Sequence, residues 1–347
     1  MYRKLLFLAV SFFILVITTY ACTGRDDDHS FTLVVIPDTQ IYCKNDPEWR
    51  RSSRKEVFYQ MTDWIARNAE AENIVFAFHV GDIVTDYDDT TQWEIASEAM
   101  RRLDGIVPYC MVVGNHDLAM GGANNRESKL FNMYFPYRRY EKEPWFGGRM
   151  ADDGFLPKNN YDNAYHLFCA GEMNFLVVAL EVAPTDKMLA WADSVILQYP
   201  DRKVILVTHS FLDSDNTRDE PGGYGYLPPG EGNTGEEIWQ KLVRKHPNMF
   251  LVLNGHHASR KDCRGFLESR GDQGNQVFQL FAGEAFDGWL RLIRFYPEER
   301  RFIVRSYSPW KPESPSHQLH QYPFSLPGYN PDKFREFEVS FKPGFPK

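Results

Sequence analysis

From residue 31 onward, the chain alternates short apolar runs with stretches of helical periodicity. The apolar runs have the length and composition of strands and occupy 31–37, 74–80, 107–113, 164–169, 174–180, 203–208 and 249–254. The helical stretches lie near 52–70, 91–103, 185–198 and 236–245. Strands that alternate with helices are typical of crossover connections, so the pattern predicts an α/β fold.

The remaining segments extend this plan. Residues 275–308 alternate apolar and polar positions in three strand-like runs, which we expect to complete a second sheet, and a short final strand is expected near 335–341. Residues 121–163 and 211–235 have little periodicity, and we expect them to form loops over a functional site. No boundary has a linker composition, which predicts a single domain over 31–347.

Five of the apolar runs end on a short polar motif. These motifs are Pro37-Asp38-Thr39-Gln40, Gly81-Asp82, Gly114-Asn115-His116-Asp117, Thr208-His209 and Gly255-His256-His257. In open α/β folds, ligand sites form at the C-terminal edge of the strands, where such side chains would gather. One Asp or Asn after a strand is often only a turn or a helix cap. Five endings with oxygen and imidazole ligands predict a metal centre.

The motifs resemble those of the calcineurin-like metallophosphoesterase superfamily, which carries Asp-x-His, Gly-Asp, Gly-Asn-His-Asp/Glu, a lone His and Gly-His-x-His. The resemblance covers residues 31–310, and the Gly114–Asp117 motif is its most specific part. The Pro-Asp-Thr-Gln opening and the segments 288–291 and 307–310 resemble a bacterial secreted branch. The resemblance implies a β-sandwich of two mixed sheets flanked by helices, with the metal site at the C-terminal edge of the strands. It also implies a hydrolase of phosphoric esters.

The resemblance also assigns roles to individual residues. The implied ligands of one or two divalent ions (Mn, Fe, Zn, Mg or Ca) are Asp38, Gln40, Asp82, Asn115, His209 and His256. Among them, Asp82 would bridge both ions. His116 would protonate the leaving oxygen, and Asp117 would orient its ring and raise its pKa.

Two positions depart from the superfamily pattern. Gln40 stands where the first motif usually has His, and Ala258 stands where the last motif has its second His. Gln40 still offers an amide oxygen, whereas Ala258 has no ligand atom. His257 is an alternative ligand, although neighbours on an extended chain point in opposite directions. By the same resemblance, Asp38 would bind the first metal, and Asn115, His209 and His256 the second. We therefore expect the first metal site to be oxygen-only and weak, so that it either prefers a hard or borderline ion such as Mn, Mg or Ca or is empty in the isolated protein.

Several residues near the motifs are candidates for substrate contact. They are Tyr42, Asn124, Asn125, Arg126 and Phe211, and ordinary loop packing explains each of them equally well. The aromatic segment 134–146 is open to two interpretations: it stacks on a nucleoside or sugar, or it forms a small satellite core.

The histidines and cysteines outside the motifs are expected to be structural. We interpret His79 and His166 as core residues and His246 as exposed, together with His29, His317 and His320. Cys110 and Cys169 lie in apolar runs and are interpreted as buried free thiols, whereas pairing among Cys43 and Cys263 is left open.

The N-terminus indicates export. Residues 1–21 have the charges, apolar run and small residues of a signal peptide, and the Ala-Cys ending at Cys22 resembles a loose bacterial lipobox. We expect a bacterial envelope lipoprotein anchored through Cys22, with 22–30 as a polar tether. Soluble export and a retained anchor are the alternatives. Asp26-Asp27-Asp28 resembles the acidic tag of surface lipoproteins, which points to the outer membrane or the cell surface.

The net charge of the chain restricts the classes of partner that we expect it to bind. The 347-residue chain has a formal charge of −8, which argues against an extended nucleic-acid surface but leaves a small phosphorylated substrate possible. No Gly-x-Ser-x-Gly, His-Glu-x-x-His or Walker phosphate-loop motif is present in the sequence. We expect an exported phosphoesterase acting on mono- or diesters. The alternative, which Gln40 and Ala258 motivate, is a non-catalytic binding or scaffold protein on a reduced fold of the same kind.

Overall fold

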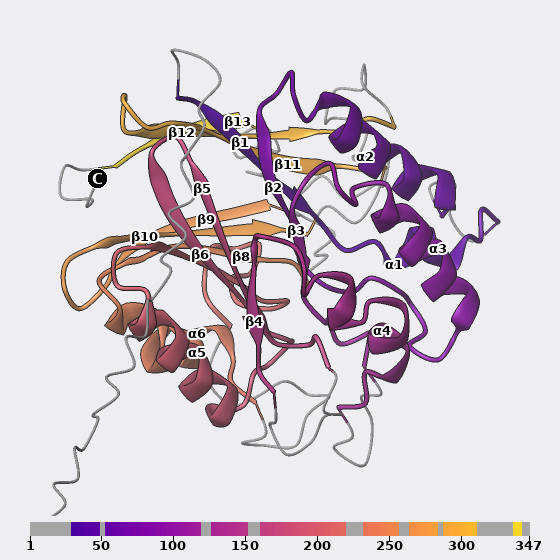
Figure 1. The fold of residues 1–347 in the computed structure, drawn as a ribbon, viewed down its shortest axis with the longest axis horizontal. Helices are drawn as coiled ribbons and strands as arrows, with labels where there is room; N and C mark the ends of the chain where they lie inside the picture. Colours follow the sequence, from indigo (N-terminus) through magenta and orange to yellow (C-terminus); the bar gives the residue numbers. More distant parts are fainter. Residues whose placement is uncertain are drawn as a thin grey trace, which may run out of the picture.

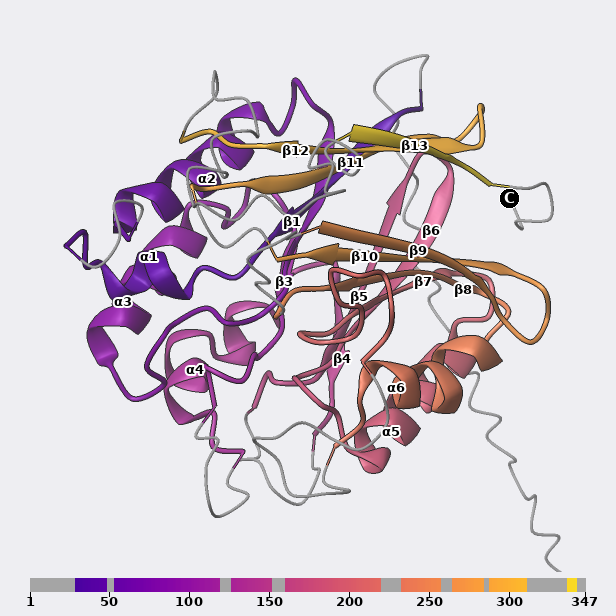
Figure 2. The ribbon, with the colours of Figure 1, turned by 180° about the vertical axis from the view of Figure 1, so that it is seen from behind.

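Two β-sheets lie face to face, and helices cover their outer faces (Figures 1 and 2). The computed structural model describes residues 29–48, 53–118, 126–151, 160–219, 232–256, 264–283, 287–310 and 336–341. This arrangement is the two-sheet α/β sandwich that the sequence predicts.

The first sheet has six strands, and its centre supplies three of the five motifs. Its order is β13 (Glu336–Ser340), β12 (Arg301–Tyr307), β11 (Leu290–Tyr296), β1 (Phe31–Ile36), β2 (Ile74–His79) and β3 (Tyr109–Met111). Strands β1, β2 and β3 are parallel, so their carboxyl ends meet at one edge. The remaining strands are antiparallel, which makes the sheet mixed.

The second sheet has seven strands. Its order is β4 (Phe146–Arg149), β5 (Ala164–Ala170), β6 (Met173–Ala179), β7 (Lys203–Val207), β8 (Met249–Asn254), β10 (Gln276–Ala282) and β9 (Arg264–Arg270). Strands β6, β7, β8 and β10 run parallel to one another. The motifs that contain His209 and His256 follow β7 and β8.

Helices cover the two outer faces separately. The first sheet is covered by α1 (Gln40–Lys44), α2 (Lys55–Asn68), α3 (Thr90–Arg101) and α4 (Lys129–Tyr134), and the second by α5 (Asp186–Gln198) and α6 (Gly235–Lys241). Short 3₁₀ turns at Tyr137–Arg139 and Val243–Lys245 complete the described elements.

Strand β1 illustrates why the central strands read as continuous apolar runs. Val34 and Ile36 pack with the residues of the helical layer, whereas Leu33 and Val35 pack with the residues between the sheets. Both faces of the strand are therefore buried, and neither face selects polar residues.

The predicted runs are strands and helices in the structure, with two corrections. The three runs in 275–308 do not form one sheet, because β10 pairs with β8 whereas β11 pairs with β1. The segment 121–163 is not a plain loop, since its described residues include α4 and β4. The expected final strand is present as β13.

The aromatic segment 134–146 contributes to a core, which decides between its two interpretations. Phe135 and Tyr140 are fully buried, and Tyr140 stacks on Tyr161 with ring centroids 4.5 Å apart. Trp145 and Phe146 pack against the same cluster. These rings pack against one another as part of a core, which favours the core interpretation.

Most of the isolated histidines and cysteines lie where expected. His79 and His166 are fully buried, which confirms their interpretation as core residues. The expectation for His246 is wrong: its ring is buried, and Nε2 lies 3.0 Å from Asp193 Oδ1. Cys43 and Cys110 are buried free thiols, whereas Cys169 is only half-buried. Cys263, His317 and His320 lie outside the described residues.

The N-terminal predictions also lie outside the described residues, because residues 1–28 are not among them. Among the helices of the described chain, none has the length and apolarity to cross a membrane.

The buried ring of His166 predicts a specific loss of stability in acid. It lies among Phe76, Trp145 and Tyr161, and burial lowers its pKa from 6.5 to about 3. The unfolded chain binds this proton near pH 6.5 but the folded chain does not. Stability should therefore fall as pH drops below about 6.5, by up to about 1.4 kcal/mol per pH unit from this residue.

Replacement of His166 by Phe should remove this contribution. Urea unfolding of both proteins from about pH 7.5 to about pH 5 should show a shallower decline in the His166→Phe variant. Parallel declines would contradict the expectation, whatever the absolute stability of the variant.

Candidate metal centre

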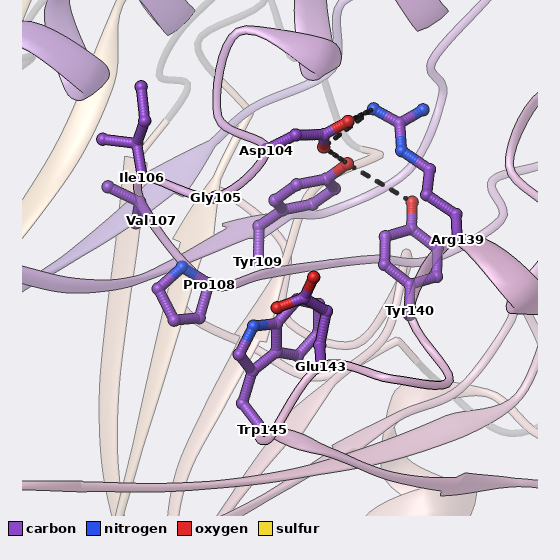
Figure 3. A pocket seen from close by; sticks show the side chains of 10 residues that line it. All are labelled: Asp104, Gly105, Ile106, Val107, Pro108, Tyr109, Arg139, Tyr140, Glu143 and Trp145. Carbon is purple, nitrogen blue, oxygen red and sulfur yellow. Dashed lines mark hydrogen bonds and ion pairs between the residues drawn. The ribbon is translucent and has the colours of Figure 1, made fainter.

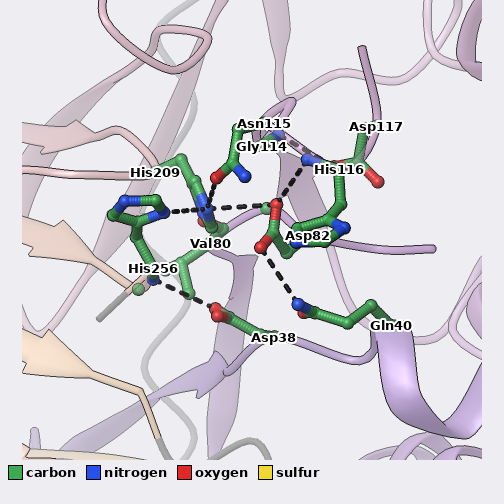
Figure 4. Close-up of polar contacts among 12 residues, drawn as sticks. Asp38, Gln40, Val80, Asp82, Gly114, Asn115, His116, Asp117, His209 and His256 are labelled. Atoms are coloured by element: carbon green, nitrogen blue, oxygen red, sulfur yellow. Dashed lines mark hydrogen bonds and ion pairs between the residues drawn. The ribbon is translucent and has the colours of Figure 1, made fainter. Parts of the chain in front are cut away.

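The five polar strand ends meet at one edge of the sandwich, as predicted. The segments after β1, β2 and β3 come from the first sheet, and those after β7 and β8 come from the second. Figure 4 shows the side chains of Asp82, Asn115, His209 and His256 directed toward one another. The ligand atoms of Asp82, His209 and His256 all lie within 4.8 Å of one another.

His209 is at the centre of this group. Its buried ring places Nε2 3.1 Å from Asp82 Oδ1, 3.2 Å from Asn115 Oδ1 and 3.1 Å from His256 Nδ1. Its other nitrogen, Nδ1, lies 2.7 Å from the carbonyl oxygen of Val80. A carbonyl can only accept, so Nδ1 is the donor and Nε2 is the nitrogen that faces the other ligands.

The donor set fits a divalent cation. Metal-bound histidines commonly donate their second ring N–H to a carbonyl, as His209 does to Val80. A carboxylate, an amide oxygen and two imidazoles converge here, and borderline ions prefer such nitrogen and oxygen ligands. Asp82, Asn115, His209 and His256 are thus the residues that would hold such an ion.

Asp38 and Gln40 lie on the other side of Asp82. Gln40 donates from Nε2 to Asp82 Oδ2 over 3.1 Å, and its Oε1 is buried without a hydrogen-bond partner among the described residues. Asp38 is buried and accepts the backbone N–H of His256 over 3.3 Å. An orphaned buried oxygen beside two carboxylates fits a second, oxygen-rich cation position.

The protonation of the metal-free group is dominated by His209. Burial lowers the pKa of His209, but the charge and hydrogen bond of Asp82 outweigh it and raise the pKa to about 9. Burial raises the pKa of Asp38 to about 7. Burial also opposes ionisation of Asp82, yet His209 holds the pKa of Asp82 below its usual range. Cation binding here would release the proton of His209.

Unusual backbone geometry brings the ligands together. Asp82 has φ 50° and His256 has φ 80°, and such left-handed conformations are uncommon for residues other than glycine. Gly81, with φ 96°, lies against His209, where an added Cβ would come within 2.6 Å of Nδ1. A Cβ at Gly114 would lie 2.3 Å from Asp82 Oδ1. The glycines of the motifs therefore allow the strand ends to approach closely.

His79 braces two of these strand ends, a role that sequence reasoning missed. Its Nε2 lies 2.9 Å from Thr39 Oγ1, and its Nδ1 accepts the N–H of Gly81 over 3.2 Å. The Thr39 hydroxyl also donates to the carbonyl of Ile83 over 3.1 Å. Nε2 is therefore protonated and the ring is neutral, in agreement with burial lowering the pKa of His79 to about 3. In the sequence, the position of His79 three residues before Asp82 was the feature that could have indicated this role.

His116 and Asp117 are both at the site, but they do not act on each other as expected. The His116 ring is exposed, and its Nδ1 lies 2.9 Å from the carbonyl oxygen of Thr85. Asp117 accepts from the backbone N–H groups of Ile83, Val84 and Gly114 over 2.8 to 3.0 Å. The prediction that Asp117 orients the ring is wrong, because its buried carboxylate is used to hold the loop after Asp82.

Three of the candidate substrate residues are structural. Tyr42 is fully buried, and its hydroxyl accepts the N–H of Gly288 over 2.9 Å. Phe211 is fully buried in the core around α5 and α6. Arg126 is buried against Glu181 and donates to the carbonyl of Val182. Asn124, Asn125 and His257 lie outside the described residues.

A separate cavity of about 300 Å³ lies at the other end of β3 (Figure 3). Residues 104–109 and the aromatic ring of Trp145 line it, and an ion pair between Arg139 and Asp104 at 2.9 Å stands beside it. Because residues 104–108 precede β3 and the motif at Gly114 follows it, the cavity is not part of the candidate metal centre.

Comparison with known proteins agrees with this geometry. A family model for the calcineurin-like phosphoesterases matches residues 31–283. The chain belongs to this family. This membership agrees with the group of possible metal ligands at the strand ends.

One curated relative matches this chain at moderate sequence identity. The uncharacterized protein YvnB of Bacillus subtilis is 30% identical over 288 residues, which cover 81% of this chain and 20% of that protein. The chain thus spans about a fifth of the length of this curated relative.

Two solved phosphatases share the fold. Purple acid phosphatase PPD1 of yellow lupin (Lupinus luteus) has a TM-score of 0.53 at 13% identity and covers 90% of this chain and 54% of its own. A dimetal phosphatase of Danio rerio has a TM-score of 0.51 at 14% identity and covers 80% and 96%. At these identities, the likeness shows the fold alone.

The position of His209 predicts that metal binding depends on it. Its replacement by Ala removes the nitrogen that faces three other ligands, and should weaken Mn²⁺ or Zn²⁺ binding by at least about 100-fold. Equilibrium dialysis with elemental analysis would measure the loss. His246→Ala, which removes another buried imidazole, is the matched control and should keep full metal binding. Equal affinity in the two variants would contradict the expectation.

Proposed function

We propose that the chain is an exported, metal-dependent phosphoesterase that hydrolyses phosphate mono- or diesters. The observation that carries the proposal is the convergence of Asp82, His209 and His256 within 4.8 Å at the strand ends, with the exposed ring of His116 beside them. A divalent cation at this place would polarise a phosphoryl oxygen and lower the pKa of a bound water.

Asp82 is the residue best placed to serve both halves of the site. Its Oδ1 faces His209 and accepts the backbone N–H of His116 over 3.0 Å, whereas its Oδ2 faces Gln40. One carboxylate therefore borders both sets of candidate ligands, which supports its assignment as the bridging group. The set that contains Asp38 and Gln40 offers oxygen ligands. We therefore propose that it binds the harder of the two cations, and binds it with the lower affinity.

His116 would supply the proton that the leaving oxygen needs. The Thr85 carbonyl accepts from Nδ1, so the proton that is exchanged must reside on Nε2. The exposed ring is accessible to a substrate, and imidazole can exchange protons near neutral pH. We assign His116 as the general acid and Asn115 as a neutral ligand beside it.

The substrate is proposed to be a small phosphorylated molecule. The formal charge of −8 argues against an extended basic surface for a nucleic-acid backbone. Two of the candidates for substrate contact, Tyr140 and Arg126, are buried in the core and are unavailable for that contact.

The function is tested by turnover of paired chromogenic phosphomonoester and phosphodiester substrates. The purified full-length chain is stripped with chelator and then supplied separately with Mn²⁺, Mg²⁺, Ca²⁺, Zn²⁺ or Fe²⁺. We expect metal-restored turnover that falls by about 10²- to 10⁴-fold in His116→Ala. A comparable loss is expected in Asn115→Ala. A folded chain without turnover under any ion would favour the non-catalytic binding protein instead.

Export is proposed from the signal-like residues 1–21 and the cysteine that follows them. In a bacterial host, mass spectrometry should find the mature chain beginning at Cys22 and carrying lipid, and Cys22→Ser should release it from the membrane fraction. An intact N-terminus would refute processing. Cleavage without lipid would support soluble export.

A further inference from the structure

The exposed ring of His116 depends for its orientation on one polar contact. Among the described residues, its ring nitrogens contact only the Thr85 carbonyl, over 2.9 Å. Exposed side chains change rotamer rapidly when nothing holds them. The direction of the Thr85 carbonyl therefore decides where His116 Nε2 points.

That direction is set by the peptide unit between Thr85 and Asp86. In a planar trans peptide, the C=O and the following N–H point in opposite directions. The Asp86 N–H donates to Gln92 Oε1 over 3.2 Å, and the Thr85 N–H donates to the same oxygen over 2.8 Å. Because Gln92 attracts the N–H side of the unit, the C=O side is turned toward His116.

Gln92 is itself held firmly. It lies in the first turn of α3 and is 4% exposed. Its Nε2 donates to Asp86 Oδ2 over 2.8 Å and to Asp89 Oδ2 over 3.2 Å, and Asp89 caps the helix by accepting from the N–H of Thr91. With two N–H groups at Oε1 and two carboxylates at Nε2, the amide has only one compatible orientation.

We propose that Gln92 is the positioning residue for His116, acting through the carbonyl of Thr85. It connects helix α3 to the proton donor and takes the orienting role that the sequence assigned to Asp117. The proposal rests on the proposed function of His116 as general acid. Gln92 itself does not contact the reacting atoms.

The dependence of the rate on the leaving group distinguishes a positioning role of Gln92 from a role in stability alone. An ester with a poor leaving group, such as a phenyl ester, needs protonation, whereas a dinitrophenyl ester does not. Gln92→Met should lower kcat about tenfold for the phenyl ester and less than about twofold for the dinitrophenyl ester. Gln92→Glu keeps an oxygen that accepts from the N–H groups of Thr85 and Asp86. This variant should show the wild-type dependence of kcat on the leaving group, even with a lower free energy of unfolding.

Two controls separate this effect from a loss of packing. Gln279 is another fully buried glutamine with three hydrogen bonds of its own, and Gln279→Met should leave the leaving-group dependence unchanged. In a His116→Ala background, Gln92→Met should have no further effect on the phenyl ester. The proposal would be overturned if Gln92→Met lowered kcat equally for both esters. It would also be overturned if Gln92→Met lowered kcat for the phenyl ester by the same factor in the His116→Ala background.

A second measurement separates failure of the inference from failure of the proposed function. Nitrogen-15 shifts of labelled imidazoles, assigned with His116→Ala, report which ring nitrogen carries the proton without any turnover. The wild-type chain should have His116 protonated at Nδ1, and Gln92→Met should lose this preference. If the wild type has no phosphoesterase activity, an unchanged ring in Gln92→Met would still overturn the positioning role, and a changed ring would support it.

Discussion

The hydrogen bond from His209 Nδ1 to the carbonyl of Val80 joins the two sheets at the metal centre. His209 follows β7 of the second sheet, and Val80 follows β2 of the first. The bond fixes the tautomer of His209, so that Nε2 faces Asp82 and Asn115. Since the ligands come from both sheets, the site exists only when the sandwich is closed, and the buried layer between the sheets maintains the centre.

The close approach of the strand ends places polar groups and backbone under constraint. Asp82 and His256 adopt left-handed conformations, and Asp38, Asp82 and His209 are buried together. Such features are unfavourable in isolation and persist where the surrounding structure determines them. Here the brace of His79 on Thr39 and Gly81, and the three amides on Asp117, determine the loops that carry the ligands.

The His116 ring and the candidate metal ligands are held by different contacts within one connected set of loops. The candidate ligands extend directly from strands of the buried sheets, whereas the His116 ring is exposed and is held from the α3 side through Thr85 and Gln92. Thr85 follows Asp82 in the same loop and its hydroxyl donates to the carbonyl of Gln40 over 2.9 Å, so the contact that orients the ring is itself tied to the candidate ligands. Asp117, although adjacent to His116, accepts hydrogen bonds from this loop and not from the ring.

The sequence by itself determined most of the strands and helices, the α/β class and the residues that gather at the strand ends. These follow from local information: apolar runs of strand length, and polar residues at the point where each run stops. Tertiary structure alone decided that Arg126 pairs with Glu181, that Phe211 and Tyr140 enter the core, and that β10 and β11 join different sheets. Those outcomes depend on partners that are distant in the chain, and residue type does not specify which partner a side chain will meet. The gathering of the candidate ligands was predictable because backbone ends place them, whereas the orientation of His116 depends on a peptide plane that no local pattern encodes.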